Sequence, residues 1–227
     1  MNIGFIPARG GSKGIPGKNL VKLGSSTLLE IGIKKLERAG CEVVYVSTDS
    51  QDIAQKANSF GAKVIERPKQ ISGDDASTES AIQHFLTSII TSSQDVIILH
   101  QLTSPFIKVS SIKACIDTIS HQSNINSCFT ALERHVFIWE KVQESEWKPQ
   151  NHQRSIRIRR QELPERVIES GGIYAFRPEE FRRQLTRYAE PSAIVKIEYI
   201  ENFEIDSPEE LTEAILIQER FGDYLDS

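Results

Sequence analysis

The stretch that decides the fold covers residues 3–19, with the sequence IGFIPARGGSKGIPGKN. It begins with a short apolar run over residues 3–6, closed by Pro7, and this run predicts a buried β-strand. A polar, glycine-rich segment over residues 8–19 follows. After it, apolar residues recur at helical spacing over residues 28–39. A strand, a loop and a helix in this order indicate the start of a βαβ unit.

The same alternation continues along the chain. Apolar runs predict strands at 43–46, 63–65 and 96–99, and regular alternation resumes at 171–176. Helices are expected at 51–60, from Ser77 onward, and at roughly 208–222, where Ser207 is a fitting N-cap before Pro208. Continuous apolar strands fit a parallel sheet covered on both faces. We therefore expect an α/β fold with a Rossmann-like, doubly wound, mostly parallel sheet, which binds ligands beyond the carboxyl ends of its strands.

The alternation breaks over residues 133–166. This stretch contains both tryptophans of the chain, two prolines, and a basic cluster formed by Arg154, Arg157, Arg159 and Arg160. We interpret it as a small arm inserted into a single domain that spans residues 1–227. Aromatic residues are enriched at protein interfaces, so we expect two copies of the chain to form a homodimer through the arm. The alternative is a solvated basic face, in which the arginines pair with Glu162 and Glu165.

Composition excludes several classes of protein. The chain has 227 residues, with 27 Lys and Arg against 31 Asp and Glu, and its net charge of -4 argues against a surface that binds nucleic acid. No apolar run approaches the ~18–20 residues of a membrane span. The three cysteines and five histidines show no zinc-ligand spacing, so we expect buried thiols. These features predict a cytoplasmic protein with no membrane or nucleic-acid partner.

Residues 8–19 carry glycines, a serine and three cations between a strand and a helix. Backbone N–H groups of glycine approach an anion closely and cationic side chains neutralise it, so the expected ligand is a polyphosphate. The loop matches neither GxxxxGK[ST], since Asn19 occupies the last position, nor the GxGxxG dinucleotide motif. A dinucleotide oxidoreductase is therefore disfavoured. The alternative is that residues 8–19 form a mobile surface loop that binds no ligand.

The segment IPARGGSKGIPGKNL closely resembles the opening motif of the acylneuraminate cytidylyltransferases, which make CMP-sialic acid from CTP and the free sugar acid. The likeness continues in family order through VSTD (46–49), ERP (66–68), DDASTE (74–79), QLTSP (101–105), RQELP (160–164), GIY (172–174) and IDSPE (205–209). The resemblance implies a sheet of the nucleotide-diphospho-sugar transferase type. It also implies CTP and a sugar acid as substrates, Mg²⁺ or Mn²⁺ as cofactor, and dimerisation through the arm.

The resemblance assigns nucleotide-binding roles to Arg9, Ser12, Lys18, Asn19, Arg67 and Ser77. The first three would hold the triphosphate, which agrees with the chemistry of cations and donors around a tri-anion. By resemblance alone, Asn19 and Arg67 would face cytosine and Ser77 would lie beside the nucleotide. An ordinary strand end is the alternative for Arg67.

On the sugar side, the candidates are Gln101, Thr103, Ser104 and Arg160. Amides and hydroxyls both donate and accept hydrogen bonds, which suits a polyol. Arg160 matches the family arginine before Gln-x-Leu-Pro and suits a sugar carboxylate or a phosphate. Leu102 stands where the family usually has proline. Ser104 before Pro105 is equally explained as a helix-start signal.

Glu204 and Asp206 form the candidate metal site. Acidic residues at i and i+2 on an extended segment point the same way, which suits Mg²⁺ held by carboxylates and substrate phosphate oxygens. The family often has Asp-x-Asp here, so Glu204 is a longer replacement. The alternative for Asp206 is a role in turning the chain into the last helix.

Together these residues predict a reaction without a covalent intermediate. The anomeric hydroxyl of the sugar acid attacks the α-phosphorus of CTP in line and pyrophosphate leaves, while Arg9, Lys18 and Asp206 support the transfer through positioning and charge. N-acylneuraminate is the first-choice acceptor, and Kdo, legionaminate or another nonulosonate is the alternative. From another class, a catalytically silent nucleotide-sugar-binding module would be expected to lose the loop cations or the metal carboxylate.

Overall fold

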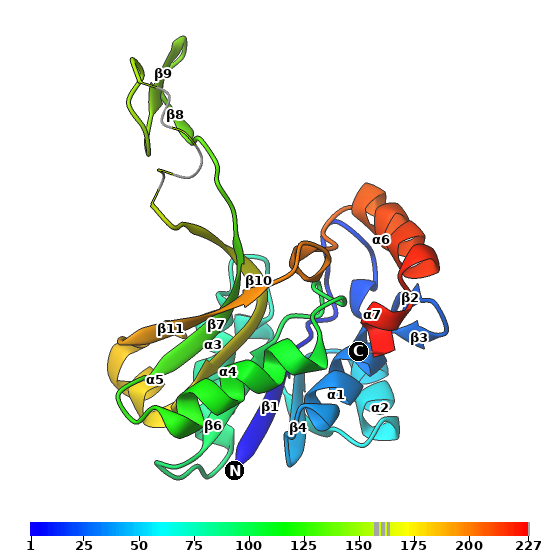
Figure 1. Cartoon of the computed structure of the whole chain (residues 1–227). Helices are drawn as coiled ribbons and strands as arrows, with labels where there is room; N and C mark the ends of the chain where they lie inside the picture. Colours follow the sequence, from blue (N-terminus) through cyan, green and yellow to red (C-terminus); the bar gives the residue numbers. More distant parts are fainter. Residues whose placement is uncertain (157–158, 160–161, 163, 227) are drawn as a thin grey trace.

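The computed structural model describes residues 1–156, 159, 162 and 164–226. Its centre is a seven-stranded sheet made of β1 (Asn2–Pro7), β4 (Val43–Thr48), β5 (Lys63–Glu66), β6 (Val96–His100), β7 (Ser127–Glu133), β10 (Val167–Phe176) and β11 (Ser192–Ile197). The strands lie in the order β11-β7-β10-β6-β1-β4-β5 (Figure 1). From β6 to β5 all neighbours are parallel, which confirms the predicted doubly wound, mostly parallel sheet.

Helices cover both faces of the sheet. They are α1 (Leu28–Arg38), α2 (Gln51–Ser59), α3 (Thr78–Ser88), α4 (Val109–His121), α5 (Pro178–Gln184), α6 (Pro208–Arg220) and α7 (Asp223–Asp226). Side-chain caps begin several of them: the Ser77 hydroxyl accepts from the backbone N–H of Ser80, and Ser207 forms a capping box with Glu210. The cap predicted at Ser207 and the helix predicted from Ser77 onward are thus confirmed. In the described part of the chain, no helix has the length and apolarity needed to cross a membrane.

The core has one layer on each face of the sheet, because successive strand residues point to opposite sides. On β6, Ile98 packs in a cluster with α1, α2 and α4, whereas Leu99 packs in a second cluster with α3 and α5. In that second layer the rings of Phe5 and Phe85 stack with centroids 4.3 Å apart. Fully buried strands of this kind explain the continuous apolar runs in the sequence.

One half of the sheet departs from simple βαβ alternation. β10 runs antiparallel to both β6 and β7, and β11 is parallel to β7. The direction reverses because β7 and β10 are the two sides of a long excursion whose far end is the arm. No apolar pattern described above predicts β7, α4 or β11.

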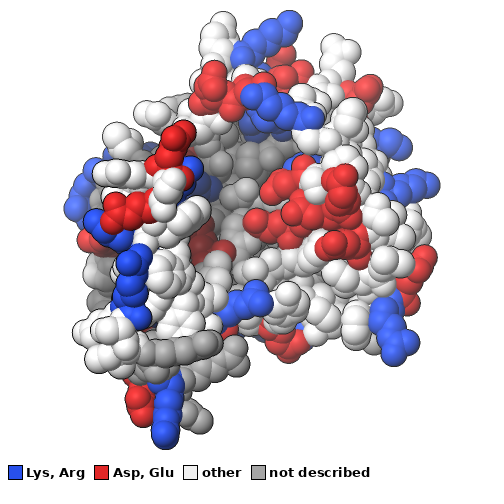
Figure 2. All heavy atoms as spheres, turned by 90° about the horizontal axis from the view of Figure 1, so that it is seen from above, with Lys and Arg blue, Asp and Glu red and all other residues white. Residues whose placement is uncertain are grey.

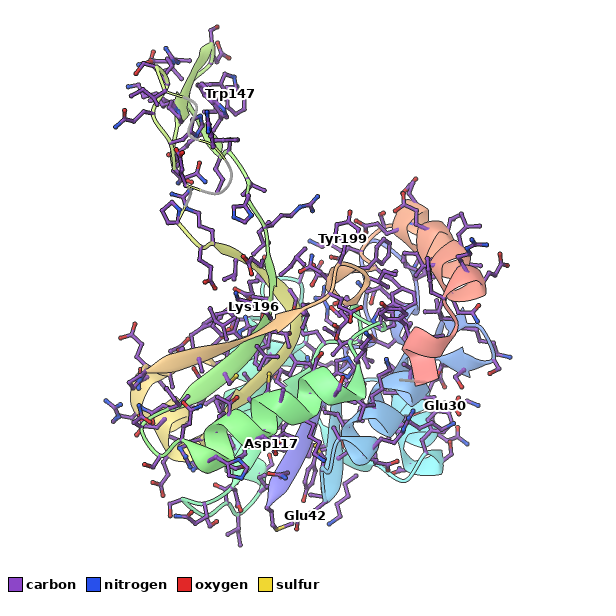
Figure 3. The ribbon with its side chains drawn as sticks, viewed as in Figure 1. Glu30, Glu42, Asp117, Trp147, Lys196 and Tyr199 are labelled. Atoms are coloured by element: carbon purple, nitrogen blue, oxygen red, sulfur yellow. The ribbon has the colours of Figure 1, made fainter. Side chains whose placement is uncertain are left out.

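The arm lies between β7 and β10 and extends away from the sheet (Figure 1). Its hairpin pairs β8 (Trp139–Gln143) with β9 (Glu146–Pro149). Figure 3 shows Trp147 far from the body of the molecule, on the distal part of the arm. The interruption predicted over residues 133–166 therefore corresponds to a projecting hairpin with its flanking segments.

All three cysteines are buried, as predicted. Burial raises the pKa of the Cys41 thiol to about 12, so this thiol stays protonated near neutral pH.

Candidate active site

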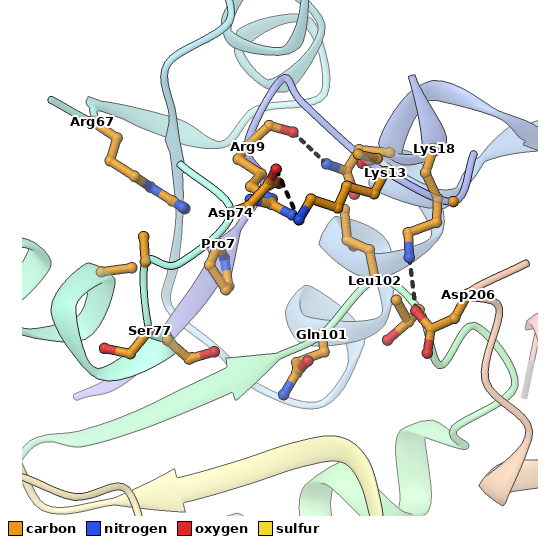
Figure 4. Close-up of a pocket in the computed structure, with 17 residues that line it drawn as sticks. Pro7, Arg9, Lys13, Lys18, Arg67, Asp74, Ser77, Gln101, Leu102 and Asp206 are labelled. Atoms are coloured by element: carbon orange, nitrogen blue, oxygen red, sulfur yellow. Dashed lines mark hydrogen bonds and ion pairs between the residues drawn. The ribbon is translucent and has the colours of Figure 1, made fainter. Parts of the chain in front are cut away.

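A cavity of about 360 Å³ lies beyond the carboxyl ends of β1, β5 and β6, where a doubly wound sheet binds its ligands. On this face, seen from above in Figure 2, acidic side chains gather beside a hollow. Most of the predicted site residues line the cavity: Arg9, Ser12, Lys18, Asn19, Arg67, Ser77, Gln101, Thr103 and Asp206 (Figure 4). Segments far apart in the sequence therefore meet at the carboxyl ends of the strands, where the sequence predicts the ligand site.

The glycine loop after β1 is held in a fixed shape around its cations. The amide nitrogen of Asn19 donates to the backbone oxygen of Arg9 at 2.9 Å, which ties the two ends of the loop together. At Gly14 a Cβ would lie 2.0 Å from the backbone oxygen of Asp206, so only glycine allows this approach. The loop thus packs directly against the segment that precedes α6.

Lys18 joins the loop to the candidate metal segment. Its Nζ donates to Oδ1 of Asp206 at 2.9 Å and to the backbone oxygen of Ile205 at 3.0 Å. The Lys18 side chain is only 15% exposed, whereas that of Asp206 is 64% exposed. The ammonium is therefore held at the cavity wall, while the carboxylate opens towards solvent and a ligand.

Two residues that the sequence analysis left unassigned, Lys13 and Asp74, also line the cavity. Oδ1 of Asp74 lies 3.0 Å from NH1 of Arg9, and Oδ2 lies 3.1 Å from Nζ of Lys13. Lys13 belongs to the cationic loop that the sequence singled out. Asp74 lies in a turn before α3 and begins the DDASTE segment (74–79) quoted for the resemblance, which assigned it no role.

Arg67 is buried at the end of β5. Its guanidinium donates to the hydroxyl and backbone oxygens of Ser47, at 3.0 and 2.7 Å. Burial lowers its pKa to about 10, and the charge of Asp49 partly offsets that effect, so Arg67 is a cation at neutral pH. The side chain is fixed to β4 while still lining the cavity.

The segment after β6 forms the floor of the cavity. Gln101, Leu102 and Thr103 line it, and the backbone oxygen of Thr103 accepts from the N–H of Ile205 at 2.8 Å. Ser104, predicted to face the sugar, is fully buried beneath this floor and is not among the residues that line the cavity. Its hydroxyl has no hydrogen-bond partner in the described part of the chain.

Glu204 lies in an acidic environment next to Asp206. Burial raises its pKa, and the negative charges of Asp206 and Glu169 raise it further. Its carboxylate packs against Gly171, where a Cβ would lie 2.0 Å from Oε1 and where φ is +70°. Carboxylates that lie close together in this way favour the binding of a cation. Arg160, the fourth sugar-side candidate, lies outside the described residues.

A doubly wound sheet with a cationic glycine loop at its carboxyl edge is typical of nucleotide-binding α/β enzymes. The family model described as cytidylyltransferase matches residues 3–221. The chain belongs to the cytidylyltransferase family.

Individual relatives agree with this assignment. N-acylneuraminate cytidylyltransferase B of Danio rerio is 35% identical over 173 residues, which cover 75% of this chain and 40% of that protein. CMP-N,N'-diacetyllegionaminic acid synthase of Legionella pneumophila is 36% identical over 122 residues, covering 51% of each. The chain spans about half or less of the length of these relatives.

The fold is shared with solved structures. A CMP:2-keto-3-deoxy-manno-octonic acid synthetase complexed with CTP superimposes with a TM-score of 0.70 at 17% identity, covering 96% of this chain and 98% of that chain. At this identity the comparison shows the fold.

Proposed function

We propose that the chain transfers CMP from CTP to a free nonulosonic sugar acid and releases pyrophosphate. One observation carries the proposal: Arg9, Lys13 and Lys18, from a single glycine loop, line a cavity at the carboxyl edge of the sheet in a member of the cytidylyltransferase family. Three cations around a cavity of this size suit a triphosphate.

The reaction is a single in-line displacement. The anomeric oxygen of the sugar acid forms a bond to the α-phosphorus, the bond between that phosphorus and the bridging oxygen breaks, and pyrophosphate leaves while the hydroxyl proton is released. Arg9 and Lys18 neutralise phosphate charge, and the cavity wall holds the two substrates in line. Asn19 and Arg67 face the cytosine, Ser12 and Ser77 contact the nucleotide, and Gln101 and Thr103 face the sugar.

Asp206 and Glu204 fit a divalent cation, Mg²⁺ or Mn²⁺. Their carboxylates are the oxygen ligands that these ions prefer. Burial first, and then the negative charges of Asp206 and Glu169, raise the pKa of Glu204, so part of that rise comes from neighbouring acidic groups. Among the described residues no cluster of three or more metal-binding side chains occurs. Asp206 and Glu204 would hold the ion together with phosphate oxygens of the substrate. The ion supplies charge neutralisation at the α-phosphate.

N-acylneuraminate is the first-choice acceptor, in line with the name of the Danio rerio relative. Legionaminate and Kdo are the alternatives, and the Legionella pneumophila relative is named for the former. The test is pyrophosphate release with CTP and Mg²⁺ across a panel of these sugar acids. Release with one acceptor identifies the substrate. No release with any nonulosonic acid contradicts the proposal.

The arm supports a homodimer in which it completes the active site of a second copy of the chain. Trp139 and Trp147 are 43% and 51% exposed on a hairpin whose strand residues are almost all exposed, an arrangement expected of side chains that become buried on association. Arg160, from the same excursion, is assigned to the sugar carboxylate or a phosphate.

A further inference from the structure

One carboxylate bridges two cations of the glycine loop. Asp74 uses one oxygen on Arg9, at 3.0 Å, and the other on Lys13, at 3.1 Å (Figure 4). The same NH1 of Arg9 also donates to the backbone oxygen of Gly73 at 2.8 Å. A single acidic turn thus satisfies both cations at the mouth of the cavity.

The turn is built to bring Asp74 there. Just before it, the hydroxyl of Ser72 donates to the backbone oxygen of Pro68 at 2.9 Å, and the N–H of Ala76 closes the turn on Gly73 at 3.2 Å. Ser77 then caps α3. Anchors on both sides fix the turn, while the Asp74 side chain itself is 44% exposed and can leave its partners without disturbing the core.

A nucleotide triphosphate would compete for these partners. Phosphoryl oxygens and carboxylate oxygens are the same kind of acceptor for Arg and Lys. Lys13, followed by Arg9, holds the pKa of Asp74 below its ordinary value, so the carboxylate is charged at neutral pH. Two anions at one pair of cations repel each other, even in water.

We propose that Asp74 is an internal counter-anion of the phosphate loop, which occupies Arg9 and Lys13 in the free protein and is displaced by a polyphosphate. The inference rests on the proposed function in taking this cavity to be the triphosphate site. It makes Asp74 a residue that sets the affinity of the loop for anions: a ligand must replace both contacts, so weakly bound anions are disfavoured. Return of Asp74 to the cations also assists release of pyrophosphate.

The test is calorimetric titration of the full chain with inorganic tripolyphosphate, and separately with CTP, both without divalent cations. The variant is Asp74→Asn. The matched control is Asp75→Asn, which removes the same charge at the next residue, an exposed position outside the lining of the cavity in the described chain. Circular dichroism and thermal unfolding verify that all three proteins are folded.

Asp74→Asn should bind tripolyphosphate about three- to tenfold more tightly than wild type, since two exposed ion pairs no longer compete. Its affinity for pyrophosphate should rise as well. Asp75→Asn should stay within about twofold of wild type, because salt screens the longer-range charge. Equal affinities in the two variants, weaker binding by Asp74→Asn, or no binding of tripolyphosphate by any of the proteins overturns the inference.

The CTP titration separates this inference from the proposed function. Binding of tripolyphosphate with the expected gain, but no binding of CTP even when that titration is repeated with Mg²⁺, supports the counter-anion and contradicts the cytidylyltransferase proposal. Binding of CTP by wild type with no gain in Asp74→Asn leaves the proposed function standing and overturns the counter-anion.

Discussion

Nζ of Lys18 lies 2.9 Å from Oδ1 of Asp206, although 188 residues separate them in the sequence. The pair joins the two chemically distinct parts of the site, the cationic loop after β1 and the acidic segment before α6. In the proposed function, Lys18 would bind phosphate and Asp206 a divalent cation. The contact would then hold both groups beside the position at which charge develops during transfer.

Asp206→Asn should lower kcat by about 10²–10³, because it removes a charge that stabilises the transition state through the metal. Folding should be unaffected, since the side chain is 64% exposed. Glu204→Gln should lower kcat less. The measurement is kcat under saturating Mg²⁺, together with a thermal unfolding curve. A near-normal kcat in Asp206→Asn would remove this residue from the metal site.

Gly14→Ala should disrupt the junction between the loop and the metal segment. The new Cβ would lie 2.0 Å from the backbone oxygen of Asp206, so one of the two segments must move. We expect the free energy of unfolding to fall by about 1–3 kcal/mol, as in other overpacked sites, and kcat to fall with it. Gly11→Ala is the matched control, because its Cβ would meet nothing within 4 Å. Equal behaviour of the two variants would contradict the close approach.

Stability should depend on pH through Glu204. Its folded-state pKa is raised above the ordinary 4.5, so on raising the pH the unfolded chain loses this proton first. Relative to Glu204→Gln, wild type should therefore lose stability as pH rises from about 4.5 through the raised pKa, and the loss is complete above it. Thermal unfolding of both proteins across this range checks the sign. Parallel curves would contradict the burial and the acidic surroundings described for Glu204.

Wild type and Glu204→Gln also test whether a divalent cation binds at Glu204. Once the Glu204 carboxylate is ionised it lies beside other acidic groups, and a divalent cation should relieve that repulsion. Mg²⁺ should raise the melting temperature of wild type more than that of Glu204→Gln. An equal rise in both proteins would mean that the ion acts elsewhere.

Replacing both Trp139 and Trp147 by serine should convert a dimer into a monomer, because it removes the large exposed apolar surface of the arm. Sedimentation over a range of protein concentrations gives the mass of each species. Ile90→Ser is the control, since Ile90 is 99% exposed and lies outside the arm. A wild-type chain that stays monomeric at every concentration, or a variant that still dimerises, would contradict the role of the arm.

The parallel half of the sheet could be predicted because β1, β4 and β6 are buried on both faces and are therefore continuously apolar. The strands of the other half, and those of the arm, are harder to predict from the sequence. β11 lies at the sheet edge and is only partly buried, and nearly every residue of β8 and β9 is exposed. None of these three strands therefore carries a strong apolar pattern. The reversal of β10 depends on the path through the arm, which no local pattern encodes.

Most of the residues that line the cavity could be predicted from the sequence, because they lie in the glycine loop, at strand ends or in the motifs of the resemblance. Ser104 was placed in the cavity by its neighbours in sequence, but the turn after β6 directs its side chain into the core. Asp74 stands in the DDASTE segment quoted for the resemblance, but no local pattern indicates its role. Its contacts with Arg9 and Lys13 join residues more than 60 positions apart, and only the tertiary fold brings them together.

The most direct measurement is ³¹P nuclear magnetic resonance of the chain with Mg²⁺, a nonulosonic sugar acid and each of the four ribonucleoside triphosphates in turn. With CTP, the account predicts equal amounts of pyrophosphate and of a new phosphodiester at the former α-phosphorus, and little product with ATP, GTP or UTP. Equal product from UTP would contradict the cytosine-facing roles of Asn19 and Arg67. No phosphodiester from CTP with any nonulosonic acid would contradict the account as a whole.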